Sequence, residues 1–133
     1  LLITPDYAVC SDCLAELNDI ENVRFEYPFI TCTNCGPRYS IINKLPYDRV
    51  LSTMDKFEMC ENCETEYTTP QNKRFHSQTN SCADCGIELQ LFDSKNVNKP
   101  IHIGHEIASV VNALNDGKII AVNVIAAQNY RNG

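Results

Sequence analysis

The eight cysteines of this 133-residue chain constrain its fold more than any other feature. They form four Cys-x2-Cys pairs, and every cysteine of the first half recurs 50 residues later. Two residues between paired cysteines let both thiolates reach one ion from a single tight turn, and two such turns complete a tetrahedral four-sulfur shell. The sequence therefore predicts two copies of one small module, each with a structural zinc ion. The predicted metal ligands are Cys10, Cys13, Cys32, Cys35, Cys60, Cys63, Cys82 and Cys85.

The cellular compartment and the cysteine spacing favour zinc over other uses of cysteine. Residues 1–5 lack the basic start and long apolar core of a signal peptide, and no apolar run approaches the roughly 20 residues that span a bilayer. We therefore expect a cytoplasmic protein without membrane contact, and disulfides are rare in that compartment. Common ferredoxin clusters take three cysteines from one short run, unlike the pairs here. Iron–sulfur clusters and disulfides stay open as weaker alternatives.

Two pairings of the cysteines into metal sites are possible. Pairing within each repeat needs the shorter loop closure and is preferred, whereas a nested set of residues 10 and 13 with residues 82 and 85 stays open. A glycine follows the second pair of each repeat, at Gly36 and Gly86. We expect both glycines to take a positive φ that aims backbone amides at the sulfurs.

Local patterns predict the elements between the cysteines. Residues 11–18 begin with capping residues and place Leu14 and Leu17 at helical spacing, so a short helix is predicted there, with residues 64–67 in the same place of the second repeat. Residues 24–32 and 74–82 alternate bulky and polar side chains, which predicts a short strand in each module. Residues 37–58 are rich in large apolar side chains and are expected to pack between the modules.

The composition changes after Phe92. The polar stretch 93–100 is typical of a linker. Behind it, Ile107, Val110, Val111 and Leu114 lie at helical spacing, and residues 118–125 form an apolar run typical of a strand. One helix and one strand do not make a domain, so this region is interpreted as the truncated start of an α/β element.

Charge argues against nucleic acid as a partner. The chain carries 11 Lys and Arg against 17 Asp and Glu, a net charge of −6, whereas nucleic-acid binding depends on cations that neutralise phosphates. Arg38, Arg49 and Arg74 are candidates for binding a phosphate, but compensation of thiolate charge is the preferred interpretation. His76 is a candidate zinc ligand, but eight cysteines already complete two shells, so a packed histidine is preferred.

The residues between the cysteines also resemble a known family. The resemblance rests on Tyr27-Pro28-Phe29, Cys32-Thr33-Asn34-Cys35-Gly36-Pro37-Arg38-Tyr39-Ser40-Ile41, Leu45-Pro46-Tyr47-Asp48-Arg49 and Arg74-Phe75-His76. This combination covers residues 5–86 and resembles the double finger of the HypF family, the hydrogenase maturation carbamoyltransferases. Residues 105–122 resemble, more weakly, the helix and Gly-Lys-Ile strand that open the YrdC-like domain of that family.

The resemblance implies a fragment of a larger enzyme with acylphosphatase-like, YrdC-like and Kae1-like domains. Such an enzyme uses carbamoyl phosphate and ATP and passes a carbamoyl group to the acceptor protein HypE, where it becomes a cyanide ligand of nickel–iron hydrogenase. This segment would hold two zinc ions and orient the catalytic domains. It is expected to be inactive alone, and no catalytic residue is carried over. The alternative is a stand-alone two-finger module that binds proteins, as in DnaJ-type chaperones.

These inferences combine into one predicted layout. The fold class is small and metal-stabilised, with two tandem four-cysteine zinc fingers, each a short helix plus short β segments, and a truncated α/β element after them. The first finger is assigned to residues 1–40, a packed inter-finger segment to 41–54 and the second finger to 55–92. A linker is assigned to 93–104 and the start of a YrdC-like domain to 105–133.

Overall fold

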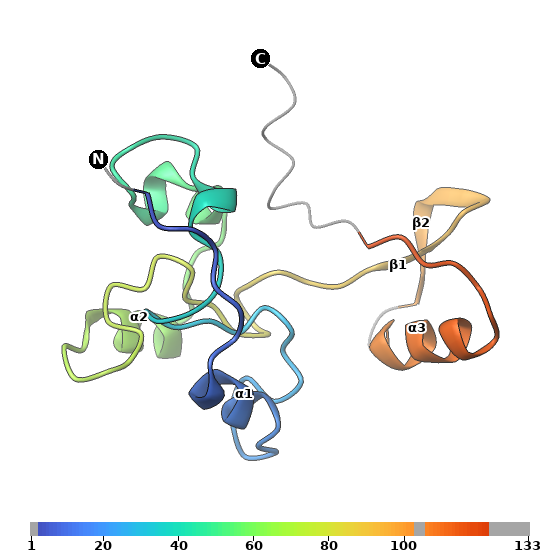
Figure 1. The fold of residues 1–133 in the computed structure, drawn as a ribbon, viewed down its shortest axis with the longest axis horizontal. Coiled ribbons are helices and arrows are strands. Elements are labelled where there is room, and N and C mark those ends of the chain that lie inside the picture. Colours follow the sequence, from blue (N-terminus) through green and yellow to red (C-terminus); the bar gives the residue numbers. More distant parts are fainter. Residues whose placement is uncertain (1–2, 103–105, 123–133) are drawn as a thin grey trace. The chain divides into compact units, whose positions relative to one another are not determined.

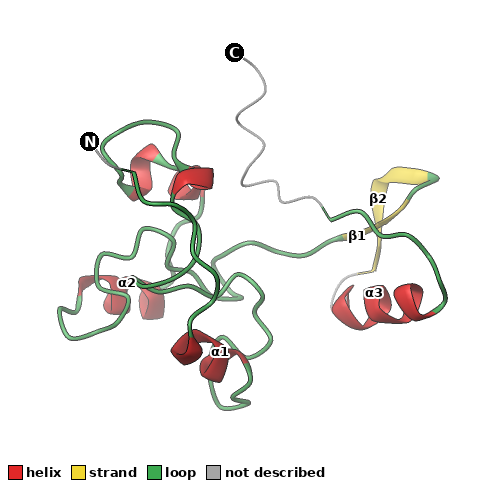
Figure 2. Ribbon diagram, in the orientation of Figure 1, coloured by secondary structure: helices red, strands yellow, loops and turns green. Residues whose placement is uncertain are grey.

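The computed structural model describes residues 3–102 and 106–122. The chain divides into two compact units between Ile87 and Glu88, here called the finger unit (residues 3–87) and the C-terminal unit (residues 88–122). Helices α1 and α2 and three short 3-10 helices belong to the finger unit, whereas strands β1 and β2 and helix α3 belong to the C-terminal unit (Figure 1). Loops and turns make up most of the finger unit (Figure 2).

Helices α1 (Ser11–Leu17) and α2 (Glu61–Thr68) begin directly after the first cysteine of a pair. Cys10 and Cys60 are the N-cap residues, and their carbonyls accept the first helical hydrogen bonds, at 2.9 Å in both repeats. The second cysteine of each pair therefore lies in the first turn, where it is buried. These helices confirm the two that the sequence predicts.

The strands predicted over residues 24–32 and 74–82 do not form. Successive turns occupy both segments, each closed by a backbone hydrogen bond between residues three apart, such as Tyr27 to Arg24 and Ser77 to Arg74. Glu26 and His76, which are equivalent in the repeat, take positive φ values of 55° and 52°. The alternating pattern arises because the turns send some side chains into the finger interior, and not because a strand pairs with a neighbour. Among the described residues of the finger unit, β pairing consists of isolated bridges: Tyr7 with Gly36, Cys32 with Cys35, and Ile42 with Ser52.

The segment between the fingers is packed, as expected from its apolar content. It contains the 3-10 helices η1 (Tyr39–Ile41), η2 (Arg49–Leu51) and η3 (Thr53–Lys56). Ile41, Ile42 and Met54 are buried, whereas Leu45 and Val50 are exposed. The core of the first finger consists largely of sulfur, because Cys13, Cys32 and Cys35 cluster with Tyr27 and Ile30.

The C-terminal unit contains a β-hairpin and a helix. Strand β1 (Leu91–Asp93) pairs antiparallel with β2 (Asn96–His102), with Leu91 opposite His102 and Asp93 opposite Asn96. The assignment of residues 93–104 to a linker is therefore wrong for residues 93–102. Asp93 closes the turn by accepting a hydrogen bond from the Lys95 amide at 2.8 Å, so the polar stretch is that of a tight turn and not of a linker.

Helix α3 (Glu106–Asn115) confirms the helix predicted in the C-terminal unit. It ends at Asn115, and Gly117, two residues later, has a φ of +76°. The strand predicted after it is absent from residues 118–122, which have no regular structure, and residues 123–125 lie outside the described part of the chain. An apolar strand needs a hydrogen-bonding neighbour, and Ile119 remains almost fully exposed. Within the described ranges, no helix is both long and apolar enough to cross a membrane.

Candidate metal centres

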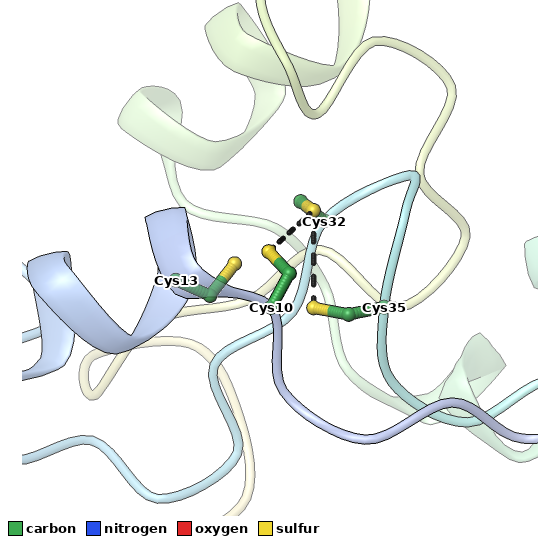
Figure 3. Close-up of side chains that lie close together, drawn as sticks. All are labelled: Cys10, Cys13, Cys32 and Cys35. Carbon is green, nitrogen blue, oxygen red and sulfur yellow. Dashed lines mark hydrogen bonds between the residues drawn. The ribbon is translucent and has the colours of Figure 1, made fainter.

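The first cysteine cluster joins the start of α1 to the loop that carries the second pair. The Sγ atoms of Cys10, Cys13, Cys32 and Cys35 all lie within 4.8 Å of one another. Cys32 Sγ is 3.7 Å from Cys10 Sγ and 3.8 Å from Cys35 Sγ (Figure 3). A tetrahedral zinc ion with Zn–S bonds of about 2.3 Å places its sulfurs about 3.8 Å apart. The cluster therefore has the spacing of a zinc shell.

The second cluster repeats this arrangement with Cys60, Cys63, Cys82 and Cys85. The Sγ atoms of Cys60 and Cys82 are 3.6 Å apart, and those of Cys63 and Cys85 are also 3.6 Å apart. The Sγ atoms of Cys82 and Cys85 are 3.8 Å apart. All eight cysteines are free, since a disulfide would bring two sulfurs to about 2.05 Å. The structure thus groups the sulfurs within each repeat and not in the nested order.

Burial makes four of the eight thiols harder to ionise. It raises the pKa of Cys13, Cys32, Cys63 and Cys82. Cys10 differs, because the backbone amide of Cys13 at the start of α1 lowers its pKa to about 7. A four-thiolate shell around a divalent ion carries a net charge of −2, and that charge needs nearby donors in a buried site.

Backbone amides supply part of this compensation, although not through the glycines as predicted. The Asn34 amide donates to Cys32 Sγ at 3.3 Å. Gly36 does have a positive φ, but its amide donates to the Tyr7 carbonyl, whereas Gly86 has no positive φ and donates to the Cys82 carbonyl. Close packing explains both glycines, because an added Cβ would lie 2.4 Å from Thr31 Cγ2 at Gly36 and 2.0 Å from Tyr27 Oη at Gly86.

Two buried arginines cross between the fingers. Arg24 of the first finger donates from Nη2 to Cys63 Sγ of the second finger at 3.4 Å and pairs with Glu66 at 2.5 Å. Arg74 of the second finger places its Nη2 4.0 Å from Cys13 Sγ of the first and pairs with Glu16. The Glu66 carboxylate keeps Arg24 charged, since its ion pair outweighs burial and raises the arginine pKa.

Each crossed arginine also donates a hydrogen bond to a backbone carbonyl of the other finger. Arg24 Nε donates to the Ser81 carbonyl at 2.8 Å, and Arg74 Nε donates to the Thr31 carbonyl at 2.9 Å. Ser81 and Thr31 each precede the third cysteine of their module and occupy equivalent positions of the repeat. The contacts of the two arginines are therefore related by the 50-residue repeat, and each finger completes the surroundings of the other finger's sulfurs.

The other residues singled out in the sequence have structural partners. Arg38 donates to the carbonyls of Pro37, Cys32 and Thr33, and Arg49 to those of Gln78, Asn80 and Phe57. Neither arginine donates to a sulfur, so charge compensation applies to Arg74 and not to them. His76 packs its ring on Tyr67 and Phe75, with centroid distances of 5.1 and 4.3 Å. Neither metal-binding cluster found in the described residues includes a histidine.

Sequence reasoning missed two residues beside the second cluster. Arg24 is equivalent to Arg74 in the repeat, so the 50-residue offset was the signal that pointed to it. Asn80 is fully buried, accepts from Arg24 at 3.0 Å and donates to the Cys63 carbonyl at 2.9 Å. The equivalent residue of the first finger is Ile30, so no repeat pattern indicates Asn80.

A small hollow lies beside Arg38. Its volume is about 110 Å³, and Thr33, Tyr47, His76, Ser77 and Gln78 complete its lining. The buried Ser77 hydroxyl has no hydrogen-bond partner among the described residues. A polar hollow of this size has room for water molecules that satisfy such a group.

Comparison with known proteins identifies relatives of the finger unit. A family model described as "HypF finger" matches residues 9–42 and 59–92, one finger each. The curated protein "Carbamoyltransferase HypF" of Synechocystis is 58% identical over 55 residues, which are 41% of this chain and 7% of that protein. "Probable carbamoyltransferase HypF" of Methanocaldococcus jannaschii is 60% identical over 47 residues, which are 35% of this chain and 6% of that protein.

Solved structures of HypF proteins are also similar to this chain. The chain is similar to full-length HypF in a phosphate- and nucleotide-bound crystal form, with a TM-score of 0.75 and 45% identity over 92% of this chain and 16% of that one. It is also similar to HypF of T. kodakarensis, with a TM-score of 0.81 and 43% identity over 87% of this chain and 15% of that one. The chain thus spans only a small part of the relatives it matches. Because the family model covers just over half of the 133 residues, the chain belongs to the HypF finger family.

Proposed function

We propose that the eight cysteines bind two structural zinc ions, one in each cluster. The observation that carries this proposal is that the four sulfurs of each cluster lie within 4.8 Å of one another. Five of the sulfur pairs are 3.6 to 3.8 Å apart, the separation expected in a tetrahedral shell. Four thiolates fill that shell, so no position is left for substrate or water. Each ion would contribute an apparent binding free energy of about 10 to 16 kcal/mol to a module too small to fold on apolar burial alone.

We further propose that this chain is the finger segment of a HypF-like carbamoyltransferase in the cytoplasm. The curated relatives carry the name carbamoyltransferase, and the chain matches 6 to 8% of their length. ATP, carbamoyl phosphate and a HypE-like acceptor would belong to that whole protein, whose further domains would be acylphosphatase-like, YrdC-like and Kae1-like. The fingers would orient those domains and would turn over no substrate by themselves. The crossed arginines support this role, because they join two small modules into one stiff spacer.

Metal analysis tests the zinc proposal directly. The purified chain should contain two zinc ions and be colourless, whereas a brown protein or a single ion per chain would overturn the assignment. Cys10→Ser/Cys35→Ser and Cys60→Ser/Cys85→Ser are matched variants that should each lower the zinc content by at least one ion. An unchanged content in either variant would exclude that cluster as a metal site.

The orienting role needs the full-length protein encoded by the extended reading frame. A variant with both crossed arginines replaced, Arg24→Met/Arg74→Met, should keep ATP-dependent formation of the carbamoyl adenylate but lose transfer of the carbamoyl group to the acceptor. Small-angle scattering should show a broader distribution of shapes for the same variant. Normal transfer with a broadened distribution would refute the orienting role and leave the zinc proposal intact.

A further inference from the structure

The turn that carries each crossed arginine also leads to a cysteine pair of its own finger. Arg24 lies on the turn between α1 and the Cys32 pair, but its guanidinium is held by the second finger. Three groups hold it there: the Glu66 carboxylate, the Asn80 side-chain oxygen and the Ser81 carbonyl. The position of this turn in the first finger therefore depends on order in the second finger.

The groups that hold Arg24 are themselves placed by the second cluster. Glu66 follows Cys63 by three residues on α2, so both lie on the same side of that helix. Ser81 directly precedes Cys82. Drawing Cys63 and Cys82 onto one ion would fix Glu66 and Ser81 at the same time, and both of these residues hold Arg24.

The first cluster acts on the second finger through equivalent residues. Cys13 and Glu16 lie on α1, and Thr31 directly precedes Cys32. Glu16 and the Thr31 carbonyl hold Arg74, which lies on the turn that leads to the Cys82 pair. Lys73 adds a contact to Glu16 at 2.7 Å. Each cluster thus prepares the turn on which the other depends.

A single charged network also contacts both clusters. Arg24 and Arg74 are 1% and 2% exposed, and both lie against sulfur. Arg74 Nη1 is also 3.6 Å from Glu66 Oε1, so the two arginines and the two glutamates form one network. This one network therefore contacts a sulfur of each cluster, Cys63 of the second and Cys13 of the first.

From this reciprocal arrangement we propose that the two metal sites load cooperatively, as one binuclear unit. The proposal rests on the proposed binding of two zinc ions. Energetic coupling between two sites acts equally in both directions, and typical coupling changes an affinity about 5- to 150-fold. Zinc in either cluster should therefore raise the affinity of the other cluster within this range.

Native mass spectrometry of the 133-residue chain at one equivalent of zinc tests the proposal. Two uncoupled sites leave about half or more of the chains with a single ion, whether or not their affinities are equal. With equal intrinsic affinities, coupling of 5- to 150-fold lowers this one-zinc share to between about 31% and about 8%. Because the two sites are copies of one module, similar intrinsic affinities are expected, and a one-zinc share of half or more then refutes cooperative loading; failure to reach two ions at excess zinc refutes the zinc assignment itself.

Variants then test whether the arginines carry the coupling. Arg24→Met/Arg74→Met should raise the one-zinc share to about half or more. Arg24→Lys/Arg74→Lys keeps both charges and should bring the share part of the way back to the wild-type value.

Arg49→Met is the matched control, because Arg49 is also buried but donates to carbonyls and not to sulfur. It should keep the low share of the wild type. A low share in the double methionine variant, or equal shares in the double variant and the control, would show that the arginines do not couple the sites. The wild-type measurement needs no variant, so the proposal stays testable even if a variant fails to fold.

Discussion

Gly86 of the second finger leaves no room for a side chain, because Tyr27 of the first finger lies directly against it. A methyl group at Gly86 would lie 2.0 Å from Tyr27 Oη, and 2.8 Å from both the Cys82 carbonyl oxygen and Ser81 Cβ. Tyr27 is 4% exposed, and its Oη lies 3.1 Å from Ser81 Oγ and accepts from the Ile87 amide at 3.0 Å. The ring has little space to move, so Gly86→Ala should force the fingers apart at this point.

The expected loss follows from these contacts. Displacing the phenol breaks two hydrogen bonds of about 1 kcal/mol each, and overpacking a dense site costs about 1 to 3 kcal/mol. Gly86→Ala should therefore lower the free energy of unfolding by about 3 to 5 kcal/mol. In a Tyr27→Phe background the oxygen is absent, and only the two 2.8 Å contacts remain. The same substitution should then cost about 1 to 3 kcal/mol, a favourable coupling of about 2 kcal/mol.

Wild type, Gly86→Ala, Tyr27→Phe and the double variant form a double-mutant cycle. Denaturant unfolding of each zinc-loaded chain, followed by far-ultraviolet circular dichroism, measures the four free energies of unfolding. The matched control is Gly117→Ala, where φ is +76° but no atom lies within 4 Å of the added Cβ. This change strains only the end of α3 and should leave the finger transition unchanged. A cost of Gly86→Ala below about 1 kcal/mol, or an equal cost in both backgrounds, would refute the packing argument.

Three further predictions concern the charge network and the metal. Burial raises the pKa of Glu16, but its ion pairs with Arg74 and Lys73 outweigh burial and hold the pKa below the ordinary 4.5. The resulting stability should be complete above pH 4.5 and disappear as the pH falls through the lowered pKa. Urea titrations of wild type and Glu16→Gln should therefore differ at pH 7 and converge once the pH falls below that lowered pKa. Asn80→Ala removes three hydrogen bonds, two of them buried, and thermal unfolding should show a loss of about 2 to 3 kcal/mol. A loss below about 0.5 kcal/mol would mean that water replaces the side-chain amide. Chelation of zinc should abolish the circular dichroism of α1 and α2, and added zinc should restore it; helices that persist in the metal-free chain would contradict the view that sulfur and metal replace an apolar core.

Local patterns predicted the elements whose stabilising contacts are close in the sequence. The two finger helices follow their N-capping cysteines, and α3 follows the spacing of Ile107, Val110, Val111 and Leu114. The strand predictions at 24–32 and 74–82 were wrong because alternation of bulky and polar residues does not distinguish a strand from a series of turns. The linker prediction was wrong because polar residues are equally typical of a hairpin turn.

The candidate metal site was predictable in composition but not in its surroundings. Eight cysteines in a repeated spacing determine two four-sulfur clusters, and the shorter loop closure correctly favours pairing within each repeat. The role of Arg24 was not predicted, although its equivalence to Arg74 was visible. An internal repeat shows which residues correspond, but it does not show whether a residue contacts its own copy or the other one.

By itself, the sequence therefore determined the two four-cysteine donor sets, the number of modules and the helices next to the cysteines, because all of these depend on spacing along the chain. Only the tertiary structure decided that Arg24 reaches Cys63 and Glu66, that Arg74 reaches Cys13 and Glu16, and that Gly86 faces Tyr27. These contacts join residues about 40 to 60 positions apart. Their formation depends on how the two related modules pack against each other, and local spacing carries no information about that packing.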